Sequence, residues 1–406
     1  MRHLLRLLIV LAGFGFATAA VAQVPPKPDL LILVSLDGFR SDYLARGKTP
    51  ALAALAAEGV QAPMRPSYPS LTFPNHYTLV TGRRPDRNGI VDNTMDDPVL
   101  GHFTMEKSTD PRWWNEAEPL WVTADKQGLK TATMFWPGSD RTIRGHLPDY
   151  WLPYSKTFLA DDRVDQALKW LDLPQGQRPN FVTLYFDLVD TEGHHHGPNS
   201  KELDDALVST DASVGRLVAG LKARGLYDKT NLIVVADHGM ADTSKDRLIY
   251  IDDVAGDPKT IHTVTLGTSS GLSVAKDAPK GTLGRILAAH DHMQCWKKAD
   301  MPRRLHYGSN PRVPPVVCLA EVGWYITTHE RLAAMKDVNL GSHGFDPAAP
   351  QMAALFIAEG PAFQHGKSMP AFDNVDIQPL MAQLLHIQAP KADGSARTFK
   401  GVLTAH

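Results

Sequence analysis

The chain has 406 residues and carries 42 basic and 44 acidic side chains, which gives a formal net charge of −2 at pH 7. This near balance excludes the strongly basic surface that is typical of nucleic-acid scaffolds and of proteins that bind anionic membranes. The length is sufficient for two domains, or for one large α/β domain that carries an insertion.

The first 22 residues have the pattern of a secretory signal peptide. Arg2 and Arg6 form a charged start, residues 4–20 are largely apolar, and Ala20-Val21-Ala22 forms an A-x-A cleavage site. The alternative is an uncleaved membrane anchor, but the apolar stretch is short and rich in glycine and alanine for a span of about 20 residues. We therefore expect a secreted protein, periplasmic if the cell is bacterial, with no membrane span in the mature chain.

Apolar runs of strand length alternate with helix-like patterns along most of the chain. The runs predict strands that are covered on both faces, at residues 30–36, 132–136, 181–186, 232–236 and 354–358. Apolar residues at spacings of three and four predict helices at residues 50–58, 119–127, 162–171, 203–221 and 376–385. This alternation predicts an α/β fold with a mostly parallel central sheet and helices on both faces. In such sheets, ligands bind beyond the carboxyl ends of the strands.

Residues from about 243 to 338 break this alternation. They contain many prolines and glycines, both cysteines, and short β-like pieces at residues 316–319 and 324–327. We interpret them as an insertion or smaller subdomain within a single catalytic domain that spans residues 23–406. We expect Cys295 and Cys318 to form a disulfide, because two thiols in an exported protein usually pair. Two buried free thiols are the alternative.

Carboxylates and histidines follow three of the predicted strands. Six such residues stand out: Asp37, Asp190, His194, Asp237, His238 and His343. Carboxylate oxygens and imidazole nitrogens are ligands that suit zinc, and three Asp with three His could hold two ions. The spacing of Asp190 and His194 is expected to place both on one side of a turn. A single Asp or His at a strand end is more often a cap or a hydrogen-bonded core residue, so the prediction depends on the whole set.

Thr72 is the candidate nucleophile. A threonine hydroxyl attacks poorly unless a base or a metal removes its proton, and a zinc ion could do so by lowering the pKa of a bound oxygen. The alternative local role for Thr72 is to be the N-cap of a helix that begins near Pro74. The two roles can coexist, and a helix start also presents backbone N–H groups to an anion.

Several short motifs surround these residues along the chain. They are residues 35–40 (SLDGFR), 72–76 (TFPNH), 81–85 (TGRRP), 89–93 (GIVDN), 136–138 (WPG), 190–194 (DTEGH) with Gly197-Pro198, 237–240 (DHGM) and 342–344 (SHG). In these motifs, which come in the family's order and span most of the chain beyond residue 22, the sequence resembles the nucleotide pyrophosphatase/phosphodiesterase family of the alkaline phosphatase superfamily. The resemblance implies the alkaline-phosphatase-like fold, a three-layer α/β sandwich.

The resemblance also implies a role for each residue at the site. Two zinc ions would be bound, the first by Asp37, Thr72, Asp237 and His238, and the second by Asp190, His194 and His343. Thr72 would attack phosphorus in line and form a covalent phospho-threonine intermediate. Asn93 and the backbone N–H of Thr72 or Phe73 would bind a non-bridging phosphoryl oxygen.

Phe73 and Tyr185 match the places where the family holds the base of its substrate, and stacking on an aromatic ring tolerates any base. Tyr185 could instead be a core aromatic residue with a hydrogen-bonded hydroxyl. Among the three adjacent histidines, His194 matches the family's motif, whereas His195 and His196 do not. We expect His76 to support the nucleophile loop through hydrogen bonds.

The sequence therefore predicts an exported two-zinc phosphodiesterase or nucleotide pyrophosphatase that releases nucleoside monophosphates from small nucleotide substrates. Two other substrate classes stay open. The first is choline-type phosphodiesters such as glycerophosphocholine, since aromatic rings also attract a quaternary ammonium group. The second is phosphomonoesters. A non-catalytic binding protein on the same fold is a further class, against which the complete set of ligands and Thr72 argue.

Overall fold

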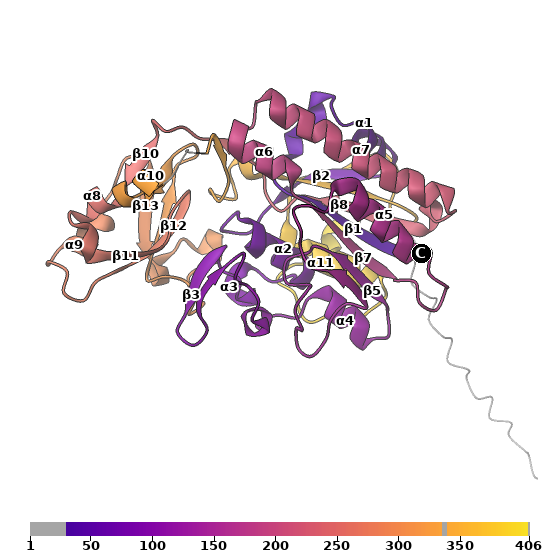
Figure 1. Ribbon diagram of the computed structural model, residues 1–406, viewed down its shortest axis with the longest axis horizontal. Helices are drawn as coiled ribbons and strands as arrows, with labels where there is room; N and C mark the ends of the chain where they lie inside the picture. Colours follow the sequence, from indigo (N-terminus) through magenta and orange to yellow (C-terminus); the bar gives the residue numbers. More distant parts are fainter. Residues whose placement is uncertain (1–29, 335–338, 405–406) are drawn as a thin grey trace, which may run out of the picture.

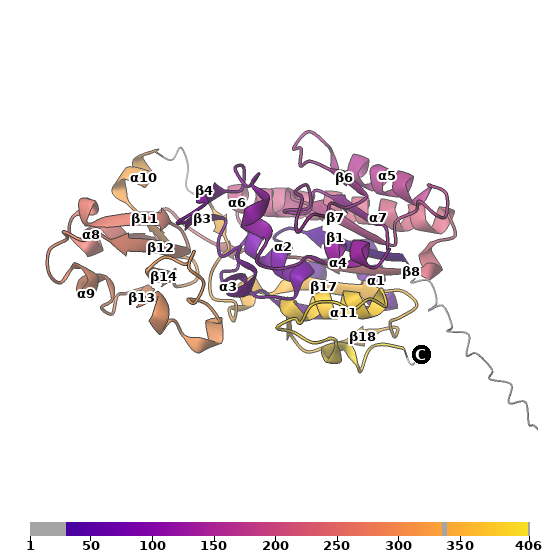
Figure 2. The same ribbon diagram turned by 90° about the horizontal axis from the view of Figure 1, so that it is seen from below.

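The structure is a computed structural model that describes residues 30–334 and 339–404. The signal peptide predicted at residues 1–22 lies outside these ranges. A large lobe with a central sheet and a smaller β-rich lobe lie side by side (Figures 1 and 2). Within the described ranges, every helix is too short or too polar to cross a membrane.

A nine-stranded sheet forms the centre of the large lobe, in the order β18-β2-β17-β8-β1-β7-β5-β6, with β19 also paired to β2. Strand β1 (Leu30–Leu36) lies between β7 (Phe181–Phe186) and β8 (Thr230–Val235), and all three are parallel. Strand β17 (Ala354–Glu359) is antiparallel to both of its neighbours. The other strands are β2 (Val60–Arg65), β5 (Thr131–Met134), β6 (Tyr150–Leu152), β18 (Lys367–Ser368) and β19 (Phe372–Asp373). The predicted α/β class with a mostly parallel sheet is confirmed.

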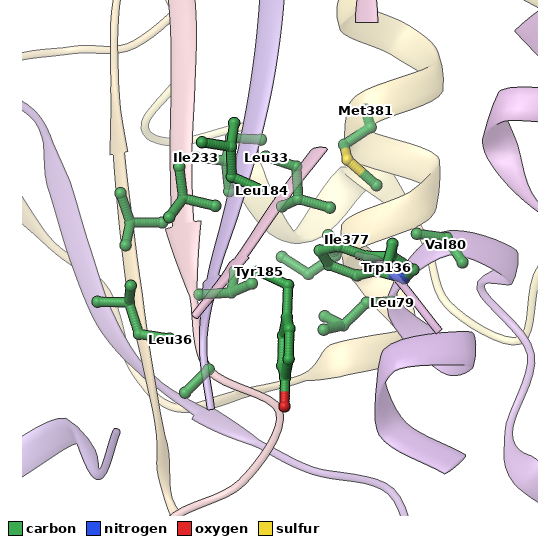
Figure 3. Packing of buried hydrophobic residues seen from close by; sticks show 14 of the residues in the cluster. Leu33, Leu36, Leu79, Val80, Trp136, Leu184, Tyr185, Ile233, Ile377 and Met381 are labelled. Carbon is green, nitrogen blue, oxygen red and sulfur yellow. The ribbon is translucent and has the colours of Figure 1, made fainter. Parts of the chain in front are cut away.

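Helices cover both faces of this sheet, which is why its strands are apolar without alternation. One layer contains α1 (Pro50–Glu58), α5 (Ala160–Leu171), α6 (Leu188–His196) and α7 (Lys201–Ala223). The other contains α2 (Thr72–Thr81), α4 (Leu120–Lys126) and α11 (Ile377–Leu384). Figure 3 shows the packing beneath α11, where Ile377 and Met381 lie near Leu33 and Leu184 of the sheet.

The smaller lobe is built on a four-stranded antiparallel sheet in the order β11-β12-β14-β13. Its elements are β10 (Leu248–Tyr250), α8 (Ile251–Ala255), β11 (Ile261–Thr265), β12 (Ser269–Val274), α9 (Thr282–Ile286), β13 (Met293–Lys297), β14 (Val316–Ala320), β15 (Tyr325–Thr327) and α10 (His329–Ala334). We propose that residues 243–338 form an inserted subdomain, because these elements enclose a separate buried cluster that includes Ile251, Leu272 and Ile326.

A disulfide joins Cys295 of β13 to Cys318 of β14 inside the smaller lobe. The two cysteines are 23 residues apart in sequence. Closing a loop of this length stabilises the folded chain by about 3 kcal/mol in the chain-entropy account. The bond therefore joins the edge strand β13 to its neighbour β14 in a lobe whose apolar core is small.

Candidate metal centre and active site

The six predicted metal ligands meet at one edge of the central sheet. Asp37 directly follows β1, and Asp237 and His238 come after β8. Helix α6, which follows β7, carries Asp190 and His194. His343 follows β16 (Gly341–Ser342), which pairs with β9 (Ala241–Asp242), just beyond His238 in the chain. Because β7, β1 and β8 are adjacent and parallel, their carboxyl ends bring these side chains together.

Asp190 and His194 lie on the same side of the chain, as predicted, but they are carried one helical turn apart by α6 instead of by a turn. The four-residue spacing puts both on the same face of a helix, with Asp190 Oδ2 at 3.4 Å from His194 Nε2. His195 and His196 are exposed, and His196 pairs with Glu192 at 3.4 Å. The helix therefore presents one histidine of the three to the cluster.

Gly38 allows the chain that follows β1 to lie close to Asp190 of α6. Its φ is +68°, and a Cβ atom built on it would lie 3.0 Å from the Cα and Cβ atoms of Asp190. A side chain at this position would be strained and would push Asp190 away from Asp37. The glycine thus permits the convergence of two carboxylates.

The three histidines of the cluster are oriented by backbone carbonyl groups. The Nδ1 atoms of His194, His343 and His238 lie 2.8, 2.9 and 3.0 Å from the carbonyl oxygens of Gly341, Ser70 and Gly239. We assign the Nδ1–H tautomer to each, because a carbonyl can only accept. Each Nε2 atom then offers a lone pair to the cluster, as is usual for metal-ligating histidines.

The donor atoms form two adjacent groups. In one group, His343 Nε2 lies 3.0 Å from His194 Nε2 and 3.4 Å from Asp190 Oδ1. In the other, His238 Nε2 lies 3.0 Å from Asp237 Oδ2, 3.5 Å from Asp37 Oδ1 and 3.3 Å from Thr72 Oγ1. Two lone pairs facing each other across 3.0 Å repel unless a cation lies between them.

Unpaired carboxylate oxygens give a further reason to expect cations. Asp37 Oδ1, Asp190 Oδ1 and Asp237 Oδ2 are buried and accept no hydrogen bond from the described part of the chain. Burying such charges without compensation is costly. Burial, together with the Asp237 and Asp190 carboxylates, raises the pKa of Asp37 well above its usual value. Burial also lowers the pKa of His343 well below its usual value. The ring therefore stays neutral, and its Nε2 lone pair can bind a metal ion. The residues therefore fit divalent metal ions.

Thr72 is the first residue of α2, and the helix bonds begin with the Asn75 N–H donating to the Leu71 carbonyl. The N-cap role that we considered for Thr72 is therefore wrong, since Leu71 holds that position. The Thr72 hydroxyl is instead available to the ligand group around His238. His76 supports this helix start as expected, with Nδ1 at 2.9 Å from the Thr72 carbonyl and Nε2 at 2.8 Å from Ser35 Oγ.

Asn93 lies against the same helix start. Its Oδ1 accepts a hydrogen bond from the Phe73 N–H at 2.9 Å. That bond occupies the Phe73 donor, and Pro74 has none. The groups left to donate to an anion in front of Thr72 are the Asn93 amide and the Thr72 N–H.

The aromatic residues near the cluster differ in accessibility. Tyr185 is 8% exposed, and its hydroxyl donates to Asp37 Oδ2 at 2.5 Å. Phe73 is half-buried and packs against Phe103 and Trp114, with ring centroids 6.1 and 5.9 Å apart. Tyr154 is 45% exposed, and its ring lies 6.4 Å from that of Tyr185. Tyr154 was missed in the sequence analysis, because it lies in a loop after β6 that carries no motif or periodicity.

The sequence matches the family described as type I phosphodiesterase/nucleotide pyrophosphatase over residues 31–346. An uncharacterised pyrophosphatase/phosphodiesterase of Schizosaccharomyces pombe is 37% identical over 92% of this chain and 79% of its own length. Human ectonucleotide pyrophosphatase/phosphodiesterase family member 1 is 37% identical over 94% of this chain, which spans 42% of the human protein. A solved structure of murine ectonucleotide pyrophosphatase/phosphodiesterase 5, an inactive threonine-to-alanine variant with AMP, superposes with a TM-score of 0.88. It is 33% identical and covers 93% of this chain and all of its own.

Proposed function

Because the chain belongs to the type I phosphodiesterase/nucleotide pyrophosphatase family, we propose that it is a two-zinc enzyme that cleaves nucleotide diesters or pyrophosphate bonds. The observation that supports the proposal most strongly is the convergence of six candidate ligand side chains beside the Thr72 hydroxyl. Three of them have buried carboxylate oxygens that accept no hydrogen bond within the described residues. We assign Asp37, Thr72, Asp237 and His238 to one ion, and Asp190, His194 and His343 to the other.

In the proposed reaction, Thr72 Oγ attacks phosphorus and the bond from phosphorus to the leaving oxygen breaks. The nucleotidyl group is then held on Thr72 until water hydrolyses this bond and releases the nucleoside monophosphate. The Asn93 amide and the Thr72 N–H donate to a non-bridging oxygen, where charge develops. The ligand side chains would hold zinc ions that lower the pKa of the threonine hydroxyl and neutralise developing negative charge.

A nucleotide substrate is supported by two accessible aromatic side chains, the half-buried Phe73 and the exposed Tyr154. We propose that the base lies between Phe73 and Tyr154, whereas the buried Tyr185 orients Asp37 through its hydroxyl. Tyr154 donates to Asp187 at 2.5 Å, and Asp187 pairs with Arg163 at 2.9 Å. That carboxylate is therefore already neutralised, which disfavours it as the acid that would hold a choline group. The complex of the murine relative with AMP agrees with a nucleotide ligand.

Export of the protein is also part of the proposal. It is supported by the signal-like residues 1–22, and by the Cys295–Cys318 disulfide, a bond that persists in oxidising compartments. Other relatives of similar identity are venom phosphodiesterases of Crotalus species.

A substrate panel tests the function directly. The purified protein is assayed with the p-nitrophenyl ester of thymidine 5′-monophosphate, with glycerophosphocholine and with p-nitrophenyl phosphate. We expect the nucleotide diester to have the highest kcat/KM, and we expect a chelator to abolish this activity and zinc to restore it. If glycerophosphocholine had the highest kcat/KM, the protein would be assigned to choline-type phosphodiesters instead. If p-nitrophenyl phosphate had the highest kcat/KM, it would be assigned to phosphomonoesters.

Two tyrosine variants separate base binding from ligand orientation. Tyr154→Ala is expected to raise KM for the nucleotide diester by about 10-fold with little change in kcat, since stacking contributes roughly 1–3 kcal/mol per base. Tyr185→Phe removes the donor to Asp37 and is expected to weaken zinc binding by about 10–100-fold. Steady-state kinetics and zinc titration against a competing chelator measure both effects. If KM increased only in Tyr185→Phe, we would conclude that the base contacts Tyr185 instead of Tyr154.

A further inference from the structure

Side chains of the smaller lobe donate hydrogen bonds to the loop that carries Asn93. This Asn93 loop, residues 89–93, connects α3 (Pro85–Asn88) to β3 (Thr94–Asp97). Tyr307 donates its hydroxyl hydrogen to the Val91 carbonyl at 3.0 Å, and Arg312 Nη1 donates to the Gly89 carbonyl at 2.7 Å. Both donors lie more than 200 residues further along the chain. The loop is thus attached to a segment that lies outside the metal centre.

Charged groups fix the structure on either side of the Asn93 loop. Before it, the buried Asp86 of α3 accepts from the backbone N–H groups of residues 308, 309 and 310 at 2.9–3.0 Å. After it, Arg312 Nε donates to Asp97 Oδ2 at 2.9 Å. Arg312 is 5% exposed, so these bonds replace its contact with water. Moving the loop would leave buried charges unpaired, which is costly.

Arg312 also contacts the aromatic wall of the site. Its guanidinium lies 4.9 Å from the centre of the Trp113 ring. Trp113 packs edge-on against Phe103 at 5.2 Å, and Phe103 packs in the same way against Phe73 at 6.1 Å. One buried side chain of the smaller lobe therefore supports both the Asn93 loop and the residue that follows Thr72.

The contact between loop and lobe is closely packed. A cavity of about 10 Å³ remains there, lined by residues that include Asp92, Thr94 and Tyr307. A space of this size holds at most one water molecule. The Asn93 loop therefore has little room to shift toward the smaller lobe.

We propose that Tyr307 and Arg312 are positioning residues that fix the Asn93 amide against the reacting phosphoryl group. The inference rests on the proposed function, in which Asn93 donates to a non-bridging oxygen. Because Asn93 Oδ1 is already bound to the Phe73 N–H, the position of the loop backbone decides where the amide group points. The smaller lobe then contributes to the rate of the reaction, in addition to covering one end of the sheet.

The test uses Tyr307→Phe, because loss of the Arg312 side chain could prevent folding. The variant keeps the ring, which packs edge-on against Tyr68 at 5.0 Å, and removes the bond to Val91. We expect kcat for the nucleotide diester to fall about 10-fold, with KM and zinc content close to wild type, since a misplacement of about 1 Å can cost about 10²-fold. Tyr150→Phe is the matched control, because it removes the same hydroxyl group from a tyrosine that donates to a backbone carbonyl, that of Gln177 at 2.9 Å, and does not contact the Asn93 loop. Its kcat is expected to stay within about two-fold of wild type.

A double-mutant cycle with Asn93→Ala separates positioning from a general structural effect. Asn93→Ala alone is expected to lower kcat by about 10²-fold. If Tyr307 acts through Asn93, Tyr307→Phe has no further effect in the Asn93→Ala background. This inference would be overturned if the kcat losses of the two single variants multiplied in the double variant. It would also be overturned if Asn93→Ala lowered kcat while Tyr307→Phe did not. Either result would leave the proposed function intact. An unchanged kcat of Asn93→Ala would instead remove Asn93 from the proposed function, and this inference with it.

Discussion

A Thr72→Ala variant is expected to lose about six orders of magnitude in kcat for nucleotide diesters, a loss of the size measured when the catalytic nucleophile is removed from another hydrolase. The Thr72 hydroxyl lies 3.3 Å from His238 Nε2, at the start of α2 and beside the Asn93 amide. Alanine deletes this hydroxyl while the other six proposed ligands stay in place. The measurement is single-turnover kinetics at saturating enzyme, which reports the chemical step without product release.

Two controls make the result specific to the nucleophile. Zinc content should stay at two equivalents in Thr72→Ala, which shows that the loss is not one of metal. Thr72→Ser should recover much of the activity, because it restores an oxygen at the same place. In addition, an acid-quenched wild-type reaction should yield a peptide with a nucleotidyl group on Thr72. Turnover by Thr72→Ala at a rate near wild type, with the group absent from the wild-type peptide, would favour direct attack by water.

The convergence of the six candidate ligands could be predicted because their positions follow from the chain's own pattern. Asp37 and Asp237 end continuous apolar runs, and the carboxyl ends of adjacent parallel strands meet at one edge of a sheet. The helical form of residues 188–196 was harder to predict. Gly193 and three histidines in succession interrupt the apolar periodicity on which such a prediction depends. The helix nevertheless buries Val189 and Gly193 and packs against α7.

The surroundings of the ligands could not be predicted from the sequence. Tyr185 was placed correctly on its strand, but its burial and its bond to Asp37 depend on how deep β7 lies in the sheet. Arg312 and the Asn93 loop are more than 200 residues apart in sequence. No local sequence pattern predicts a hydrogen bond over that separation. Sequence patterns thus indicate which chemical groups are present at the site, whereas the side chains that orient them become visible only in three dimensions.

His194→Ala should differ sharply from the two substitutions beside it. His194 faces His343 at 3.0 Å between their Nε2 atoms, and its Nδ1 is held by the Gly341 carbonyl. His195 and His196 are exposed on other sides of α6. We expect His194→Ala to bind one equivalent of zinc instead of two and to lose about 10³-fold in kcat, since a catalytic metal contributes several kcal/mol to the transition state.

The two neighbouring histidine variants are the controls for this prediction. His195→Ala and His196→Ala change the same residue type on the same helix, so any general effect of shortening a histidine on α6 appears in them too. Both should keep two equivalents of zinc and a kcat within about two-fold of wild type. His343→Ala should reproduce the His194→Ala result, because both rings face Asp190 in the same donor group. Zinc is counted by plasma mass spectrometry on dialysed protein. Equal losses for all three histidines of α6 would mean that the cluster acts through the stability of the helix, and Asp190 and His343 would then need another partner for the metal.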